Sequence, residues 1–580
     1  MLSFDVNEAE IIESAFADFH IFNGDTFTLQ AIWEELSSSS ALMIHVSQNV
    51  LNKVDAIAHH KGIKEPCTYA LADGDGFIFG KRMKVLRYHA DVGHARFWLA
   101  CSVDMNQYAM SATSGGRKLL QSEESAKQLG EVAVAEVSSS VEYEHTLTEM
   151  QGVGRNKELQ ITTETDGGDP ADYIYNFTSF DRGEIPHNET IVDLAIGEKF
   201  MMAISNSSRL YAVGKHSEGC LGLGPNVTVL SKWTRVSLND AEADEVKSVT
   251  IGNYHCMITR KDGTLWTAGR NLYGQLGLGS GYSDINNVYN YTRVESSFQG
   301  LVLDTAANDF ASYVLMNVTG TGPMLLSSGS NKFGLLLCAN GVEDLSSCNG
   351  RLTENITYKF IEASISVNQE FIDSPIAGMD ASTEAFFFWT MNGTPYAVGK
   401  SGVGHFASNE CGEYEHTFPI VMQFSDSDSD SYKIVTSISA SDAHVAVVTL
   451  NTDGKYMIYT AGLGNDGQLG NSNHSVCDNN KVLKVLDKIT FAEEDINDVL
   501  LNAISVKAWT QKESTIVRII KSPSVNDETL VYASGINDQG HIALGNSIEN
   551  VYKFTLIYGG STKYLLFADR KNMVILRPTV

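Results

Sequence analysis

The sequence predicts an all-β fold, a β-propeller, preceded by a small α+β region. Two features predict the propeller: a glycine-containing phrase recurs six times, and a strand–turn–strand pattern precedes the phrases. A sheet of about four short strands cannot bury both of its faces alone, whereas sheets stacked radially around an axis can. The 49 glycines and 10 prolines among 580 residues fit a fold with many tight turns.

The recurring phrase consists of apolar residues, a small residue, a glycine, a polar stretch and a second glycine. Its clearest copies are residues 265–279 (LWTAGRNLYGQLGLG) and 459–470 (YTAGLGNDGQLG). The first glycines of successive phrases lie 55 to 73 residues apart, which leaves room for four strands in each unit. We expect these glycines to be blade-turn residues: Gly214, Gly269, Gly329, Gly399, Gly462 and Gly535.

A strand–turn–strand signal lies upstream of the phrases. Residues 249–258 (VTIGNYHCMI) and 438–448 (ISASDAHVAVV) are apolar segments interrupted by a short turn. Asp-Gly pairs at 262–263 and 453–454 then favour hairpin turns into the next strand. Each unit is therefore expected to hold about four short strands joined by turns.

The phrases at 269–277 and 462–470 resemble the repeat of the regulator of chromosome condensation family. His255 and His444 stand where that repeat usually has a histidine after the turn. The resemblance extends from about residue 172 to the carboxyl end. It implies a seven-bladed β-propeller, although the sequence contains only six phrases.

The seventh blade is expected to come from both ends of the chain. Residues 555–576 (TLIYGGSTKYLLFADRKNMVIL) carry a strand–turn–strand half, and 173–183 (YIYNFTSFDRG) supply a strand upstream of the first full unit. Pairing the two termini in one sheet closes the ring and removes an exposed sheet edge. We therefore place the seven-bladed propeller at 168–580, with ring closure by both termini.

The residues upstream of the propeller lack the glycine phrase. Residues 7–20 and 29–36 have helical spacing of apolar residues, and 72–76 (ADGDG) favours a hairpin turn. We therefore expect a small α+β domain of unknown family at 1–104. Residues 105–167, rich in serine, glutamate and small residues, are expected to be a linker or an exposed arm.

The charge balance excludes two partner classes. The chain has 42 basic and 70 acidic residues, a formal net charge of -28. Nucleic-acid binding draws its energy from clustered Lys and Arg, and so does adhesion to anionic membranes. No run of about 18 apolar residues is present, so we expect no membrane insertion.

Two kinds of covalent modification are candidates. The eight cysteines permit disulfides, and Cys338 and Cys348 are the candidate local pair because they bracket one short loop; scattered buried thiols are the alternative. Nine Asn-x-Ser/Thr sequons would be glycosylation sites in a secreted chain. They are Asn176, Asn188, Asn206, Asn226, Asn290, Asn317, Asn355, Asn392 and Asn473.

The sequence contains no motif that indicates catalysis. It lacks the Gly-x-Ser-x-Gly elbow, the Walker loop and the His-Glu-x-x-His motif, and we expect no cofactor and no metal. His255 and His444 could act as bases. Because they recur at one position of the repeat, we favour a hydrogen bond between strands instead.

A propeller presents two wide faces of loops, and function lies in those loops. We expect a non-enzymatic protein-binding or structural module, which would be a secreted or cell-surface glycoprotein or an assembly subunit. Its partners would bind the loop faces, and another copy of the chain is one candidate partner. The family resemblance implies an alternative, a guanine-nucleotide exchange factor or regulator for a small GTPase. A cytoskeletal or ciliary scaffold is a third reading.

Overall fold

The computed structural model describes most of the carboxyl-terminal three quarters of the chain and five strands upstream. The five strands are β1 (Leu42–His45), β2 (Cys67–Asp73), β3 (Gly76–Gly80), β4 (Val85–Tyr88) and β5 (Arg96–Cys101). The other described residues are 147–157, 161, 172–238, 245–295, 300–318, 322–337, 356–363, 365, 371, 374–410, 414–425, 433–451, 455–471, 482–492, 500, 503–521, 529–545, 550–560 and 565–578.

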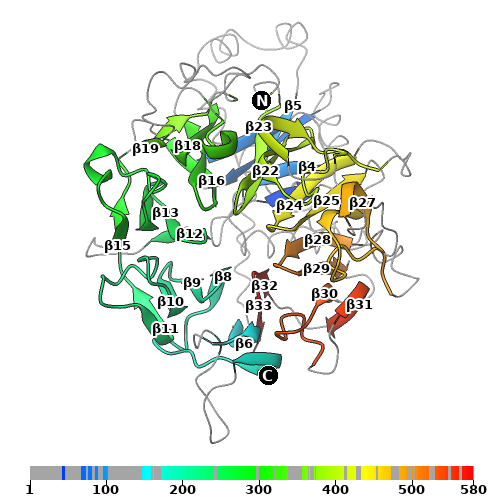
Figure 1. Ribbon diagram of the computed structural model, residues 1–580, viewed down its shortest axis with the longest axis horizontal. Helices are drawn as coiled ribbons and strands as arrows, with labels where there is room; N and C mark the ends of the chain where they lie inside the picture. Colours follow the sequence, from blue (N-terminus) through cyan, green and yellow to red (C-terminus); the bar gives the residue numbers. More distant parts are fainter. Residues whose placement is uncertain are drawn as a thin grey trace, which may run out of the picture. The chain divides into compact units, whose positions relative to one another are not determined.

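Seven four-stranded antiparallel sheets, the blades, form the propeller within these residues. The innermost strands contact one another around the axis, so the blades close into a ring (Figure 1). The first three blades are β8 (Ile191–Ile196), β9 (Phe200–Ser205), β10 (Leu210–Lys215) and β11 (Val229–Val236); β12 (Val246–Ile251), β13 (His255–Arg260), β14 (Leu265–Arg270) and β15 (Asn287–Arg293); and β16 (Gly300–Ala307), β17 (Ala311–Val318), β18 (Gly322–Ser330) and β19 (Ile356–Glu362).

The next three blades follow the same order, with the first strand innermost and the fourth outermost. They are β20 (Ile376–Ser382), β21 (Ala385–Thr390), β22 (Pro395–Ser401) and β23 (Tyr414–Val421); β24 (Lys433–Ala440), β25 (His444–Asn451), β26 (Tyr456–Leu463) and β27 (Val482–Lys488); and β28 (Ala503–Thr510), β29 (Ser514–Lys521), β30 (Thr529–Ile536) and β31 (Asn550–Gly560). Two 3-10 turns, η2 (Ser280–Tyr282) and η3 (Lys332–Gly334), lie in loops between third and fourth strands.

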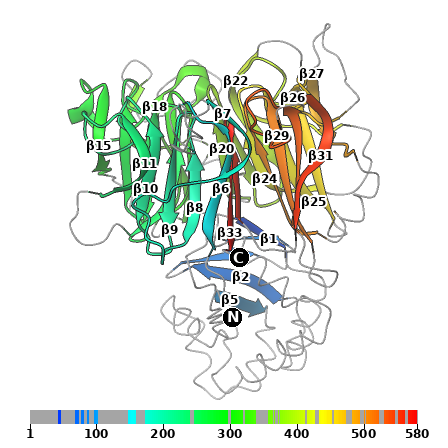
Figure 2. The same ribbon diagram turned by 90° about the horizontal axis from the view of Figure 1, so that it is seen from below.

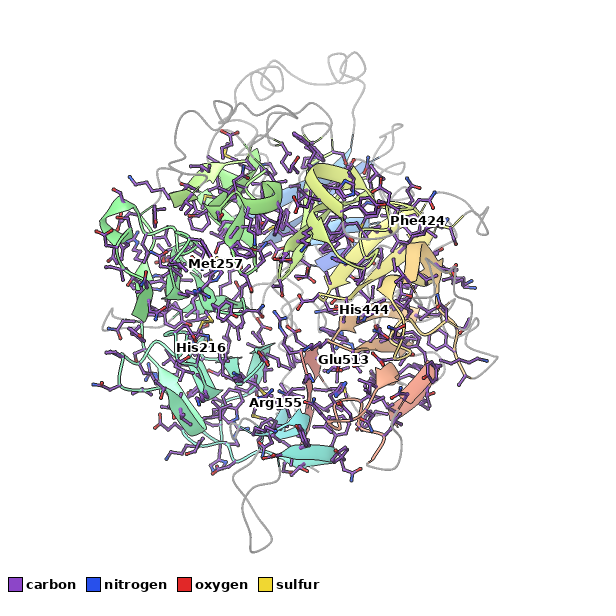
Figure 3. The ribbon with its side chains drawn as sticks, viewed as in Figure 1. Arg155, His216, Met257, Phe424, His444 and Glu513 are labelled. Atoms are coloured by element: carbon purple, nitrogen blue, oxygen red, sulfur yellow. A yellow bond between two sulfur atoms is a disulfide. The ribbon has the colours of Figure 1, made fainter. Side chains whose placement is uncertain are left out.

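The seventh blade joins the two ends of the chain, as the sequence predicts. Its order is β32 (Leu565–Asp569), β33 (Asn572–Pro578), β6 (Leu147–Arg155) and β7 (Tyr173–Ser179). The red β33 lies beside the cyan β6 in both views (Figures 1 and 2). The register pairs Met573 with Val153 and, one strand further out, Arg155 with Tyr173.

Two boundaries differ from the sequence-based expectation. The third strand of the closing blade, β6, lies inside the range 105–167 that we expected to be a linker. Residue 555, which we placed in the closing blade, belongs instead to β31, the outermost strand of the sixth blade. The closing blade therefore takes two strands from each terminus.

In the amino-terminal part, β2 and β3 pair as a hairpin in which Asp73 lies opposite Gly76, where the sequence predicts a turn. β5 extends this sheet, and β1 pairs with β4 in a second sheet. The helices expected at 7–20 and 29–36 lie outside the described residues.

The first glycine of each phrase lies inside the third strand of its blade, not at the turn that we expected. All six have φ between 102° and 126° and sit at a β-bulge, and Gly154 of the closing blade matches them with φ 116°. At Gly269, a Cβ would overlap the carbonyl oxygen of Tyr254, which accepts a hydrogen bond from the Arg270 N–H (2.8 Å). Glycine is needed because an L side chain fits neither this φ nor this close approach.

The second glycine of the phrase joins neighbouring blades. Gly274 packs on the backbone of Thr357 in β19, and Gly540 packs on the backbone of Ile174 in β7. In three units a residue with a side chain replaces the third glycine, yet the backbone keeps a positive φ: Leu337 (57°), Ala407 (50°) and Ala543 (57°). The weaker phrases therefore preserve the loop geometry of the strong ones.

The core is divided into clusters of buried apolar side chains from adjacent blades. Between the third and fourth blades, Tyr313 stacks on Phe386 with ring centroids 3.8 Å apart, and within the fourth blade Phe388 stacks on Tyr396 at 5.0 Å. Burying each such side chain contributes roughly 1.5–3 kcal/mol, so these clusters fix each blade against the next.

Candidate binding face at the channel mouth

The turns between first and second strands surround one end of the central channel. They line a cavity of about 320 Å³ to which all seven blades contribute, through Glu198 of the first blade and residues at 250–254, 305–307, 380–381, 439–442, 509–512 and 568–571 of the others. Charged side chains of both signs face this cavity, among them Asp442 and Arg570. The mouth is therefore a polar site to which every blade contributes.

Hydrogen bonds connect the mouth turns from blade to blade. Asn253 Nδ2 donates to Asp309 Oδ1 (2.6 Å) and to Thr383 Oγ1 (3.2 Å), and the Thr383 N–H donates to Asp442 Oδ1 (2.9 Å). These bonds link the second blade to the fifth without a gap.

The series continues around the other side of the mouth. The Thr510 N–H donates to Ser439 Oγ (2.9 Å), which links the fifth and sixth blades. The Lys512 N–H donates to Arg570 O (3.1 Å), which links the sixth blade to the closing one. Such a network holds the turns in place, so a partner would meet a pre-organised surface.

The carboxyl groups at and below the mouth have raised pKa values. Burial raises the pKa of Asp309 to about 6, although the Asn253 hydrogen bond opposes the shift. Burial raises the pKa of Asp380 to about 7 against backbone hydrogen bonds from Ala440 and Ala381. It also raises the pKa of Asp569.

A charged layer lies on the innermost strands. Asp193 and Lys507 line the channel as half-buried side chains on β8 and β28. Burial raises the pKa of Asp193 to about 7, and attraction to Lys507 opposes that shift. Burial lowers the pKa of Lys507, and attraction to Asp193 and Asp380 opposes that shift. Each ion therefore partly offsets the desolvation of the other.

The two repeat-position histidines bond between blades. His255 Nε2 lies 2.7 Å from Ser312 Oγ of the third blade, and Ser312 Oγ donates to Gln275 O (2.7 Å). His444 Nε2 makes the matching contact with Thr515 Oγ1 of the sixth blade (2.8 Å). Burial lowers the pKa of both histidines to about 3, so the imidazoles are neutral. Neither histidine lines the mouth cavity. The predicted hydrogen bond is present and crosses between blades.

A disulfide lies at the corresponding junction between the first and second blades. It joins Cys220, which follows the second glycine of its phrase, to Cys256, which follows His255. These are the repeat positions of Gln275 and Ser312 in the next junction. Sequence reasoning missed the pair because it favoured cysteines close in sequence; the repeat register could have found it. Cys338 and Cys348 lie outside the described residues.

The sequons are mostly at the surface. Asn317 is half-buried, and Asn355 and Asn473 lie outside the described residues. The remaining six are exposed: Asn176, Asn188, Asn206, Asn226, Asn290 and Asn392. Exposure permits glycosylation without requiring it.

Metal binding and membrane insertion find no support among the described residues. Within them, no group of three His, Cys, Asp or Glu side chains could hold a metal ion. In the same part of the chain, no helix has both the length and the apolar character to cross a bilayer.

The geometry defines a class of protein: a closed seven-bladed ring whose loops form a rigid mouth. Comparison with known proteins identifies one of its repeats. The regulator of chromosome condensation (RCC1) repeat matches residues 246–275, from the start of β12 to Gln275 after β14. The second blade therefore contains an RCC1 repeat, as its residues predict, and the described residues form a seven-bladed propeller.

Three known proteins are similar to this chain, two of them in sequence and one in structure. The human probable E3 ubiquitin-protein ligase HERC6 is 31% identical over 162 residues, 27% of this chain and 15% of that protein. The secretion-regulating guanine nucleotide exchange factor of Bos taurus is 31% identical over 140 residues, 24% of this chain and 28% of that protein. The matches thus span less than a third of either relative.

Among solved structures, Prp20p from Saccharomyces cerevisiae has a TM-score of 0.56 at 12% identity, covering 76% of this chain and 94% of that one. That protein has binding properties to Gsp1p and histones. At this identity the likeness supports the propeller fold alone.

Proposed function

We propose that this propeller is a regulator that binds a small GTPase at the channel mouth and accelerates release of its guanine nucleotide. The similarity to the bovine guanine nucleotide exchange factor carries the proposal. The mouth supports it, because all seven blades line it and hydrogen bonds connect its turns from the second blade to the closing one.

Exchange of this kind needs no covalent chemistry. A factor accelerates release when it binds the nucleotide-free partner more tightly than the nucleotide-bound one. A rigid rim suits this role because its shape does not relax to fit both states of a partner equally. The mixed charges at Asp442, Lys512 and Arg570 would fix the orientation of the docked protein.

The experiment measures release of a fluorescent GDP analogue from a panel of purified small GTPases, with and without this protein. We expect faster release from at least one of them. Asp442→Ala and Arg570→Ala should remove that acceleration, whereas Lys261→Ala, in an exposed turn between β13 and β14, should retain it. Absence of both acceleration and complex formation across the panel contradicts the proposal.

A second candidate is a secreted or cell-surface binding glycoprotein. The disulfide Cys220–Cys256 favours it, since disulfides persist in oxidising compartments, and six exposed sequons are compatible with it. Intact-mass analysis of native material, before and after reduction and deglycosylation, tests this candidate. A fully reduced, unmodified chain would remove it.

A further inference from the structure

Two adjacent blades carry aromatic side chains at positions where the other blades do not. The first position directly precedes the second strand, and it is Tyr254 in the second blade and Phe310 in the third. The second position directly precedes the second glycine of the phrase, and it is Tyr273 and Phe333 in the same blades. Elsewhere these positions hold Lys199, Glu384, Ala443, Glu513 and Lys571, and Glu218, Val403, Asp466 and Gln539.

The four aromatic residues and three cations form one continuous surface, which we call the aromatic–cation patch: Tyr254, Arg270, Tyr273, Phe310, Lys332, Phe333 and Lys400. The centroids of Tyr273 and Phe310 are 5.2 Å apart, and those of Phe310 and Phe333 are 6.4 Å apart.

The cations lie over the aromatic faces. Arg270 Cζ is 4.9 Å from the centroid of Tyr254 and 5.8 Å from that of Tyr273. Lys332 Nζ is 4.4 Å from the centroid of Phe310 and 4.5 Å from that of Phe333. Stacking holds these long side chains in place, so less conformational entropy is lost when they meet a partner.

The patch is accessible. Its aromatic side chains are half-buried, Lys332 is exposed, and the neighbouring Leu272 is 40% exposed. Phe333 has φ 59°, a backbone conformation that a bulky residue rarely adopts. The repeat can place smaller or polar residues at this position, as Val403 and Gln539 show, so the propeller fold alone does not explain an aromatic residue there.

Charge indicates the kind of partner. The patch concentrates three cations on a chain whose net charge is -28. Two carboxyl groups lie near these cations: Glu384 pairs with Lys332 and Lys400, each at 3.7 Å, and Asp309 interacts with Arg270. The local excess of positive charge favours an acidic ligand, and the exposed aromatic edges favour one that also carries apolar side chains.

We propose that the aromatic–cation patch docks an acidic protein segment with interspersed aromatic or aliphatic residues. Arg270 and Lys332 bind its carboxylates, and Tyr273, Phe310 and Phe333 pack against its apolar side chains. This site adjoins the mouth cavity, since Tyr254 belongs to both, but it does not depend on nucleotide exchange and stands whether or not the GTPase proposal holds.

The test is fluorescence anisotropy with the full-length protein and a short labelled peptide of alternating glutamate and tyrosine. We expect saturable binding that weakens with salt. Arg270→Ala and Phe310→Ala should each weaken it about tenfold, the usual scale for a central Arg or aromatic anchor. Lys332→Glu, a change at an exposed side chain, should abolish binding while leaving the unfolding midpoint unchanged.

Matched controls come from the repeat itself. Arg155 occupies in the closing blade the position that Arg270 has in the second, and Gln539 occupies in the sixth blade the position of Phe333. Arg155→Ala and Gln539→Ala should bind the peptide like the unaltered protein. Equal losses in control and patch variants would overturn the proposal, and so would equal binding of a lysine–tyrosine peptide. Tighter binding of oligo(dT) would assign the patch to nucleic acid instead.

Discussion

A glycine-to-alanine series tests whether close backbone approach holds the closing blade together. At Gly154, φ is 116°, and an added Cβ would overlap the carbonyl oxygen of Lys571. That oxygen accepts the hydrogen bond from the Arg155 N–H (3.0 Å), so an alanine must displace a bonded strand. We expect Gly154→Ala to lower the free energy of unfolding by at least about 3 kcal/mol, the range of backbone strain combined with a lost contact.

Two other glycines separate the contributions. Gly545 has φ 74° but open space around it, so Gly545→Ala should cost only the left-handed penalty of about 1–2 kcal/mol. Gly281 has neither a positive φ nor a neighbour within 4 Å, so Gly281→Ala should stay within about 0.5 kcal/mol of the unaltered protein.

Urea unfolding followed by tryptophan fluorescence gives the comparison, with all three variants at one protein concentration. The reasoning predicts the order Gly154→Ala, Gly545→Ala, Gly281→Ala, from least to most stable. Equal losses for the first two variants would mean that crowding against Lys571 contributes nothing. The account of the closing blade would then be refuted.

Three further predictions concern the junctions and the channel. The double variant Cys220→Ser/Cys256→Ser should lose about 2–4 kcal/mol of unfolding free energy, because the disulfide spans 36 residues. In thermal scans, the reduced unaltered protein should unfold at the same midpoint as this variant. Ser312→Ala should destabilise by about 1–3 kcal/mol because it leaves His255 Nε2 buried without its partner, whereas Ser217→Ala, at an exposed side chain, should have no effect in the same assay. Asp193 binds a proton more readily in the folded than in the unfolded state, since burial raises its pKa to about 7 from 3.8, so its ionisation destabilises the fold as pH rises through that window. The difference in unfolding free energy between the unaltered protein and Asp193→Asn should therefore change by about 2–3 kcal/mol between pH 8 and pH 5, and the unaltered protein gains stability at the lower pH. A difference that stays constant with pH would contradict this assignment.

The repeat made the propeller predictable, but one strand of the closing blade could not be recognised from it. β6 contains Val153, Gly154 and Arg155, which match the start of the phrase, yet no second glycine follows at the usual distance. Without that glycine the segment resembles the serine- and glutamate-rich stretch before it. Only its pairing with β33 identifies it as a blade strand.

The candidate sites were harder to predict for another reason. The mouth cavity and the aromatic–cation patch combine residues from different blades, and Tyr273 and Phe310 are 37 positions apart in the sequence. Their contact depends on the rotation from one blade to the next, which periodicity does not specify. The disulfide Cys220–Cys256 also joins adjacent blades, but it was missed for a different reason, because cysteines close in sequence were favoured over cysteines at matching repeat positions.

Repetition within one chain separates what the fold needs from what function adds. The junction between the first two blades holds the disulfide Cys220–Cys256, and the equivalent positions of the next junction are joined by a hydrogen bond from Ser312 Oγ to Gln275 O. Because the ring closes with either chemistry, the propeller does not require a particular residue type at that position. The same logic applies to Tyr254 and Phe310, whose equivalents elsewhere are charged or small. Phe310 and Phe333 pack in part against the core between the third and fourth blades, and a partner's chemistry would explain the aromatic surface that stays exposed. The peptide-binding series tests that explanation directly.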